Sequence, residues 1–291
     1  MTKARNVLRG LIASAVLAGF VVSCGGGGGG GSDAPAAAAA TVIRSASLTG
    51  AQEVPTPPVA TTATGRGAVV VNPTTLEITG GITFTGLTGN PTDAHIHQGA
   101  AGVAGGPIIT LTIAGDNATA TVPAGTTLTP TQNTALLAGE LYFNVHTTNN
   151  PDGEIRGQIT GTTGVTAGLA TLTGAQENST NTSTATGRGT IVLDSTTREI
   201  LICYVTHTVT NSTVAHIHTG APGVSGPANV VDLSAILGPI RTAPVPTTLA
   251  VSAVTDFTAG NTYFNVHSSN NLCPPAATCA AGEIRGQIAV Q

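Results

Sequence analysis

Three histidines recur with the same spacing in each half of the chain. His95 and His97 lie two residues apart, and His146 follows on a later segment. The same pattern returns 121 residues further on, as His216, His218 and His267. Alternate residues of a strand share a face about 6.6 Å apart, so two such imidazoles can reach one ion. Nitrogen ligands favour copper, with zinc next. We therefore expect one three-histidine copper or zinc site in each half.

The alternation of apolar and polar residues indicates where these histidines point. In the segment 94–97, Ile96 lies on the face opposite to both histidines. In the segment 141–146, Phe143 and Val145 share a face and His146 lies on the other. Because the apolar set must form the core face, we predict the histidines on the outer face, under loops or in solvent.

Charged residues follow His146 after a turn and alternate in the same way. Glu154 and Arg156 are predicted to point outward, where Glu154 would orient His146 and Arg156 would draw an anionic ligand to the site. In the second half these roles fall to Glu283 and Arg285. The alternative is a surface network of hydrogen-bonded polar side chains that holds no ion.

The elements that position the histidines are short and rich in β-forming residues. Five sequence blocks recur in order, which predicts two tandem domains at 42–161 and 168–291. Each contains about eight short segments bounded by glycine, proline or asparagine, typical of an all-β Greek-key sandwich or barrel. One helix is predicted to begin after Thr129 and to end at Gly139.

The first residues resemble a targeting signal. Residues 1–23 combine basic side chains with a short apolar run, as in a signal peptide, and end at a lipobox-like Val-Val-Ser-Cys. This resemblance implies an acylated Cys24, a flexible tether over 24–41 and anchoring to a membrane. Gly25 in place of aspartate implies sorting to the outer membrane or cell surface. The alternative is a plain secretory signal.

Composition limits the possible partners. Charged residues make up 8% of the chain and aromatic residues 3%. After removal of the signal peptide the chain would carry seven arginines against 14 acidic residues, which excludes a basic nucleic-acid-binding surface. The sequence contains no Gly-x-Ser-x-Gly motif, phosphate-binding loop or marked carboxylate pair, so no hydrolytic activity is indicated.

The remaining cysteines and one further histidine have structural interpretations. Cys273 and Cys279 flank a Pro-Pro pair and are expected to form a disulfide in an oxidising compartment, the alternative being two free thiols. Cys203 lies in an apolar run and is predicted to be a buried thiol. His207 has no counterpart in the first half and is predicted to be a solvated or loop residue.

Four ordered blocks in each half resemble the chordin-type (CHRD) domain. In the first half they are Leu-Thr-Gly-Ala-Gln-Glu-Val-Pro at 48–55, Ala-His-Ile-His at 94–97, Phe-Asn-Val-His at 143–146 and Gly-Glu-Ile-Arg-Gly-Gln at 153–158. The resemblance covers nearly all of the chain after its N-terminal segment. It implies an extracellular all-β module with no settled biochemical activity.

A weaker resemblance is to copper/zinc superoxide dismutase. His95, His97, His146 and Arg156 occur in the order of that family's copper ligands and C-terminal arginine. The bridging histidine and the zinc-binding cluster have no counterparts, and the loop 99–107 lacks ligands. The resemblance implies an immunoglobulin-like Greek-key sandwich. We therefore expect a non-enzymatic module that binds a metal or an extracellular protein. The alternatives are a copper redox enzyme and a structural or adhesive module without metal.

Overall fold

The computed structural model describes residues 40–54, 59–228, 230–233, 238–273, 279 and 281–291. The predicted signal peptide 1–23, the lipidation residue Cys24 and all but the last two residues of the tether lie outside the described residues. The described residues belong to one compact unit. In the part of the chain that is described, no helix has the length and apolar character needed to span a bilayer.

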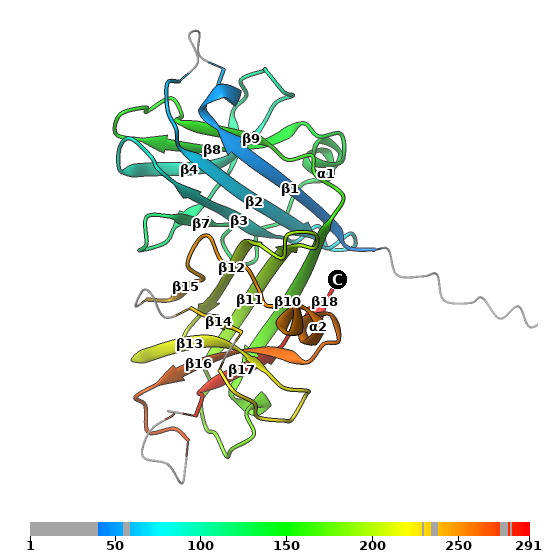
Figure 1. Cartoon of the computed structure of the whole chain (residues 1–291), viewed down its shortest axis with the longest axis vertical. Coiled ribbons are helices and arrows are strands. Elements are labelled where there is room, and N and C mark those ends of the chain that lie inside the picture. Colours follow the sequence, from blue (N-terminus) through cyan, green and yellow to red (C-terminus); the bar gives the residue numbers. More distant parts are fainter. Residues whose placement is uncertain (1–39, 55–58, 229, 234–237, 274–278, 280) are drawn as a thin grey trace, which may run out of the picture. The chain divides into compact units, whose positions relative to one another are not determined.

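Each copy is built from one highly curled antiparallel sheet (Figure 1). The strands of the first copy are β1 (Val42–Thr49), β2 (Thr64–Val71), β3 (Ile78–Thr85), β4 (Pro91–Gln98), β5 (Pro107–Thr110), β6 (Thr112–Ile113), β7 (Thr119–Thr121), β8 (Leu141–Thr147) and β9 (Ile155–Gln158). Their order in the sheet is β5-β4-β8-β9-β1-β2-β3-β7-β6. The chain therefore crosses from β3 to β4, which are not neighbours, and closes a Greek-key sandwich around one core.

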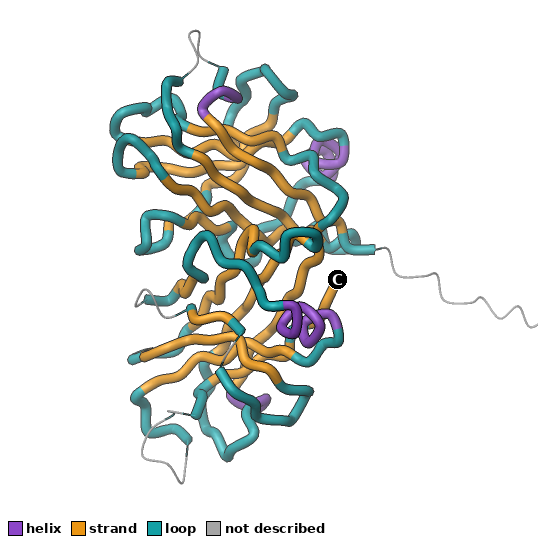
Figure 2. Tube along the Cα trace, in the orientation of Figure 1, coloured by secondary structure: helices purple, strands orange, loops and turns teal. Residues whose placement is uncertain are grey.

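The second copy repeats this arrangement. Its strands are β10 (Val165–Thr173), β11 (Thr186–Asp194), β12 (Ile200–His207), β13 (Ser212–Thr219), β14 (Val231–Asp232), β15 (Ile240–Thr242), β16 (Thr262–Ser268), β17 (Ile284–Gln287) and β18 (Ala289–Val290). They are ordered β14-β13-β16-β17-β10-β11-β12-β15, with β18 against β10. The all-β sandwich class predicted from the sequence is confirmed in both copies, and strands dominate the described chain (Figure 2).

Helices are short in both copies. The 3-10 turns η1 (Gly50–Gln52) and η2 (Gly174–Gln176) follow the first strand of each copy, and α2 covers Val251–Thr258. The predicted helix is present as α1 (Pro130–Leu137). Thr129 and Gln132 form a reciprocal capping box, and Gly139 adopts a φ of +73° directly after the helix. The local sequence therefore determined both ends of α1.

The strand β2 is apolar on both faces because it packs against two cores. Val69 and Val71 belong to the core of the first copy. Ala68 and Val70 point the other way and pack with residues of the second copy, among them Ile202. A run of consecutive apolar residues in a strand is typical of burial on both sides.

Two ion pairs flank this contact between the copies and are related by the sequence repeat. Arg66 pairs with Glu199 at 2.6 Å, and its counterpart Arg188 pairs with Glu77. Each of these arginines therefore pairs with a glutamate of the other copy. Both pairs are partly exposed, so we assign them to orientation of the copies more than to stability.

Candidate metal centre

The side-chain alternation predicted from the sequence places the histidines on one face. Ile96, Phe143 and Val145 are fully buried in the core of the first copy. His95 and His97, on β4, and His146, on β8, consequently point to the opposite side of the sheet. The strands are neighbours, with Asn144 opposite His95 in the register. Loops cover this face, so His97 is buried and His95 and His146 are half-buried.

The three imidazoles of the first copy converge. The ring centres are 5.4 Å apart for His95 and His97, 5.1 Å for His95 and His146, and 5.9 Å for His97 and His146. One nitrogen of each ring lies within 4.8 Å of a nitrogen of each other ring. Among the described residues, groups of three or more metal-ligating side chains this close together occur only here and at the equivalent place in the second copy.

Backbone carbonyl oxygens determine which ring nitrogen carries the hydrogen in His97 and in His146. The Nδ1 of His97 lies 2.8 Å from the carbonyl oxygen of Gly105, and that of His146 lies 2.9 Å from that of Pro151. A carbonyl oxygen only accepts, so each Nδ1 carries the hydrogen and each Nε2 carries the lone pair. Both Nε2 atoms, and the Nδ1 of His95, are buried without a hydrogen-bond partner.

The second copy has the same arrangement. Its ring centres are separated by 5.5 Å (His216 and His218), 5.2 Å (His216 and His267) and 5.6 Å (His218 and His267). The Nδ1 of His218 donates to the carbonyl oxygen of Gly226 at 3.0 Å, which leaves a buried Nε2 without a partner. The Nδ1 of His216 faces the Nε2 of His267 at 3.3 Å. Within each copy, the imidazole lone pairs thus point towards one another.

Burial favours the neutral form that a metal ligand needs. Burial lowers the pKa of His95, and the neighbouring His146 lowers it further, while Asp93 acts in the opposite direction. Burial is also the main cause of the lowered pKa of His97 and of His218. These imidazoles are therefore neutral at neutral pH and available as ligands.

Arg156 contacts the candidate site through the ring of Tyr142. Its side chain is buried, and its guanidinium carbon lies 3.5 Å from the centre of the Tyr142 ring. Tyr142 in turn stacks on His97, with ring centres 4.9 Å apart. The guanidinium donates to the carbonyl oxygens of Ala100 and Val103 at 2.9 and 3.0 Å. The donors of Arg156 thus fasten the loop 99–106, a role that the sequence did not indicate, while attraction of an anionic ligand by its charge stays a prediction.

Arg285 has the same environment in the second copy. It lies 3.5 Å from the centre of the Tyr263 ring and donates to the carbonyl oxygens of Ala221 and Val224. Tyr263 stacks on His218 with ring centres 5.0 Å apart. The repeat therefore preserves an arginine–tyrosine–histidine stack as a unit. We conclude that both arginines position a histidine and its covering loop.

Glu154 has a different role from the predicted one. Its carboxylate is fully buried and accepts hydrogen bonds from the side chains of Thr61, Thr88, Thr147 and Asn150 and from the Thr88 backbone N–H. The Nδ1 of His146 binds the Pro151 carbonyl instead. The prediction that Glu154 orients His146 is therefore wrong. Glu154 ties the loops before β2 and β4 to the end of β8.

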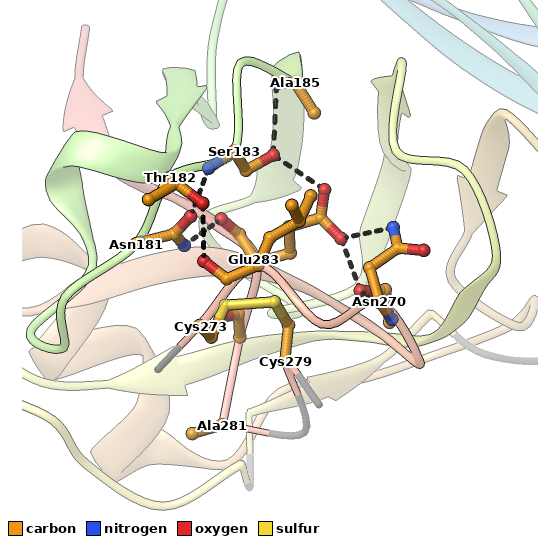
Figure 3. Close-up of a disulfide and its surroundings, with 12 residues drawn as sticks. Asn181, Thr182, Ser183, Ala185, Asn270, Cys273, Cys279, Ala281 and Glu283 are labelled. Carbon is orange, nitrogen blue, oxygen red and sulfur yellow. Dashed lines mark hydrogen bonds between the residues drawn. A yellow bond between two sulfur atoms is a disulfide. The ribbon is translucent and has the colours of Figure 1, made fainter. Parts of the chain in front are cut away.

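Glu283 ties the loop before β11 to the end of β16 and the residue Asn270 beyond it (Figure 3). Its carboxylate accepts from Ser183 at 2.7 Å, from Asn270 at 2.8 Å and from Ser268. A disulfide joins Cys273 to Cys279 beside this network, with Cα atoms 5.1 Å apart. The Cys279 N–H donates to the Asn270 carbonyl at 2.9 Å, so this end of the disulfide is joined to the residues that follow β16.

A buried carboxyl group near the candidate site, that of Glu53, was not predicted from the sequence. Glu53 follows η1 and is 9% exposed, and burial raises its pKa to about 7. Its Oε1 is buried without a partner beside Gly153 and Asn144. Glu177 repeats this environment, with a pKa raised to about 7 by burial. The available signal was the glutamate in the repeated Leu-Thr-Gly-Ala-Gln-Glu block.

These carboxyl groups predict an unusual dependence of stability on pH. Between pH 4.5 and about 7 the folded Glu53 keeps a proton that the unfolded chain has released. The unfolding free energy should therefore fall as the pH rises through this window, by about 3 kcal/mol per carboxyl group. Glu53→Gln, which mimics the protonated form, should reduce this slope in urea unfolding, whereas the exposed Glu140→Gln should leave it unchanged. An unaltered slope in Glu53→Gln would refute the assignment.

Two further sequence predictions have different outcomes. Cys203 is a buried free thiol, as predicted, and burial raises its pKa. His207 is only 7% exposed and lies at the end of β12, where burial lowers its pKa to about 4. The prediction of a solvated or loop histidine is therefore wrong. His207 belongs to neither histidine cluster.

The fold and the histidine cluster recur together in both copies and characterise this class of protein. Each copy is an all-β sandwich with three imidazoles beneath a loop fastened by a buried arginine. A family model for the CHRD domain matches residues 44–159 and 169–288, so the chain belongs to the CHRD domain family, in two tandem copies. No curated protein and no solved structure matches the chain.

Proposed function

We propose that this chain is an exported, membrane-anchored lipoprotein whose two CHRD domains each bind one transition-metal ion, Cu²⁺ in preference to Zn²⁺. The proposal depends above all on the unpaired imidazole nitrogens. His95, His97 and His146 each hold a buried ring nitrogen without a hydrogen-bond partner. Leaving a buried polar atom unpaired costs about 1–3 kcal/mol, and a shared cation would remove this cost for all three.

The chemistry of the donor set supports copper. Each cluster offers three imidazole nitrogens and no thiolate, and such sets bind Cu²⁺ most tightly among the divalent first-row ions. Backbone acceptors behind His97 and His146 fix the orientation of both rings. Such outer partners are typical of metal-binding histidines. Bound at the three nitrogens, an ion would keep a position open to a small ligand or a partner side chain.

Copper or zinc binding is tested by metal analysis of the purified protein after dialysis against excess metal. We expect about two ions per chain. A variant with alanine at His95, His97 and His146 should retain one, and a variant that also lacks the second cluster should retain none. His207→Gln is the matched control, since it changes the one histidine outside both clusters and should retain two. Unchanged metal content in the six-histidine variant would refute the proposal.

The lipid anchor is tested separately. The basic, apolar and lipobox-like segments that precede Cys24 support it, and the Cys273–Cys279 disulfide agrees with an oxidising compartment. Labelled palmitate should be incorporated by the native chain and lost in Cys24→Ser. Incorporation that persists in this variant would contradict anchoring at Cys24. A redox assay of the copper-loaded protein tests whether the site also supports turnover.

A further inference from the structure

The two candidate sites differ in what lies behind one histidine. On β4, His95 is opposite Thr110 of β5, whereas on β13 the equivalent His216 is opposite Asp232 of β14. The second copy thus has a carboxylate where the first has a neutral hydroxyl. The only acidic residue of β4, Asp93, is replaced by Val214 at the equivalent position of β13. The repeat therefore preserves the histidines but not the placement of negative charge.

The geometry directs Asp232 to the far side of the His216 ring. The Nδ1 of His216 faces the cluster, 3.3 Å from the Nε2 of His267. Its Nε2 points away from the cluster and lies 3.9 Å from the Oδ1 of Asp232. The Asp232 side chain is 70% exposed, so a change of rotamer or a bridging water closes this separation.

We propose that Asp232 strengthens metal binding by His216 and makes the second copy the tighter site. This inference rests on the proposed metal-binding function. A carboxylate that accepts the Nε2–H of a ligating imidazole holds the lone pair on Nδ1 and raises its basicity. Removing such partners weakens metal binding by about 10–100-fold. Because Asp232 is largely exposed, its effect belongs at the lower end of that range. Asp232 is a positioning residue and not itself a ligand.

The burial of one histidine also favours tighter metal binding in the second copy. His267 is 7% exposed, whereas its counterpart His146 is half-buried. In the second copy, Cys279 is linked by a disulfide to Cys273 and donates its N–H to the carbonyl oxygen of Asn270, after β16, and this disulfide has no counterpart in the first copy. An ordered and less exposed ligand loses less conformational freedom when an ion binds. This comparison supports tighter binding in the second copy independently of Asp232.

The experiment measures Cu²⁺ affinity by competition with a chelator in two single-site proteins. One carries alanine at His95, His97 and His146, and the other carries alanine at the three equivalent positions of the second copy. We expect the second copy to bind about tenfold more tightly. Asp232→Asn should remove most of this difference, and Asp232→Glu should restore it. Circular dichroism verifies that each variant is folded.

The first copy supplies the complementary test. Thr110→Asp should strengthen Cu²⁺ binding there by several-fold. Glu140→Gln removes an exposed carboxylate of the same copy, is the control for a general effect of charge and should leave the Cu²⁺ affinity unchanged. Equal affinities in the two copies, or an Asp232→Asn variant with unaltered affinity, would overturn the inference and leave the proposed function standing. Absence of binding in both copies would overturn the proposed function itself.

Discussion

Replacing Gly105 by alanine should abolish Cu²⁺ binding in the first copy and leave the second copy unaffected. A Cβ at this position would lie 1.6 Å from the carbonyl oxygen of Gln98, a contact that requires the backbone to move. The Gly105 carbonyl accepts the hydrogen bond from His97, and its N–H donates to the Tyr142 hydroxyl at 3.0 Å. Displacement of the loop therefore releases the hydrogen bond that orients His97.

The adjacent glycine provides a matched control for this prediction. A Cβ at Gly106 would have no atom within 4 Å, so Gly106→Ala should bind two ions per chain, the number we also expect for the native protein. Gly105→Ala should bind one, measured by metal analysis and by competition with a chelator. Gly105→Ala should lower the free energy of unfolding by about 1–3 kcal/mol, the usual cost of overpacking. Two bound ions in Gly105→Ala would show that the loop does not determine the site.

Replacing Glu154 by alanine should destabilise the first copy by several kcal/mol, because each buried donor left without an acceptor costs about 1–3 kcal/mol. Its carboxylate is fully buried and accepts five hydrogen bonds from four residues, Thr61, Thr88, Thr147 and Asn150. Alanine would leave these donors without their acceptor. Urea unfolding followed by circular dichroism measures the loss.

Glu140→Ala is the control for this variant, because Glu140 is an exposed acidic residue of the same copy. We expect it to change the unfolding free energy by less than about 0.5 kcal/mol. The hydrogen bonds outweigh the effect of burial and lower the pKa of Glu154, so its contribution is present above the unfolded pKa and lost as the pH falls through the folded one. A loss below about 1 kcal/mol in Glu154→Ala would contradict the role assigned to this network.

The sequence predicted those features that depend on local periodicity. The alternation around Ile96 and Phe143 placed the histidines on the face opposite to the core, and the structure confirms this placement. The Thr129 and Gln132 pair predicted the start of α1 because a capping box involves residues only three apart. The tandem repeat required only that the same blocks occur twice, and the CHRD match confirms it.

The interpretations that failed concern residues whose partners are distant in the sequence. Glu154 lies just before β9 and accepts from Thr61 and Thr88, which are 93 and 66 residues away in the sequence. Arg156 donates to carbonyl oxygens 53 and 56 residues away. Alternation predicts a face and cannot predict which loop covers it. His207 is buried for a similar reason, since its exposure depends on how distant loops pack around the end of β12.

The central claim is that three imidazole nitrogens in each copy converge on one ion, and electron paramagnetic resonance tests it most directly. The protein and its variants would be prepared with nitrogen-15-labelled histidine and loaded with one equivalent of Cu²⁺ per intact site, the variant without either site receiving the same amount as the native protein. The account predicts hyperfine couplings from three labelled nitrogens per copper in each single-site variant. Fewer than three coupled nitrogens, or an unchanged spectrum in the variant that lacks all six clustered histidines, would contradict it.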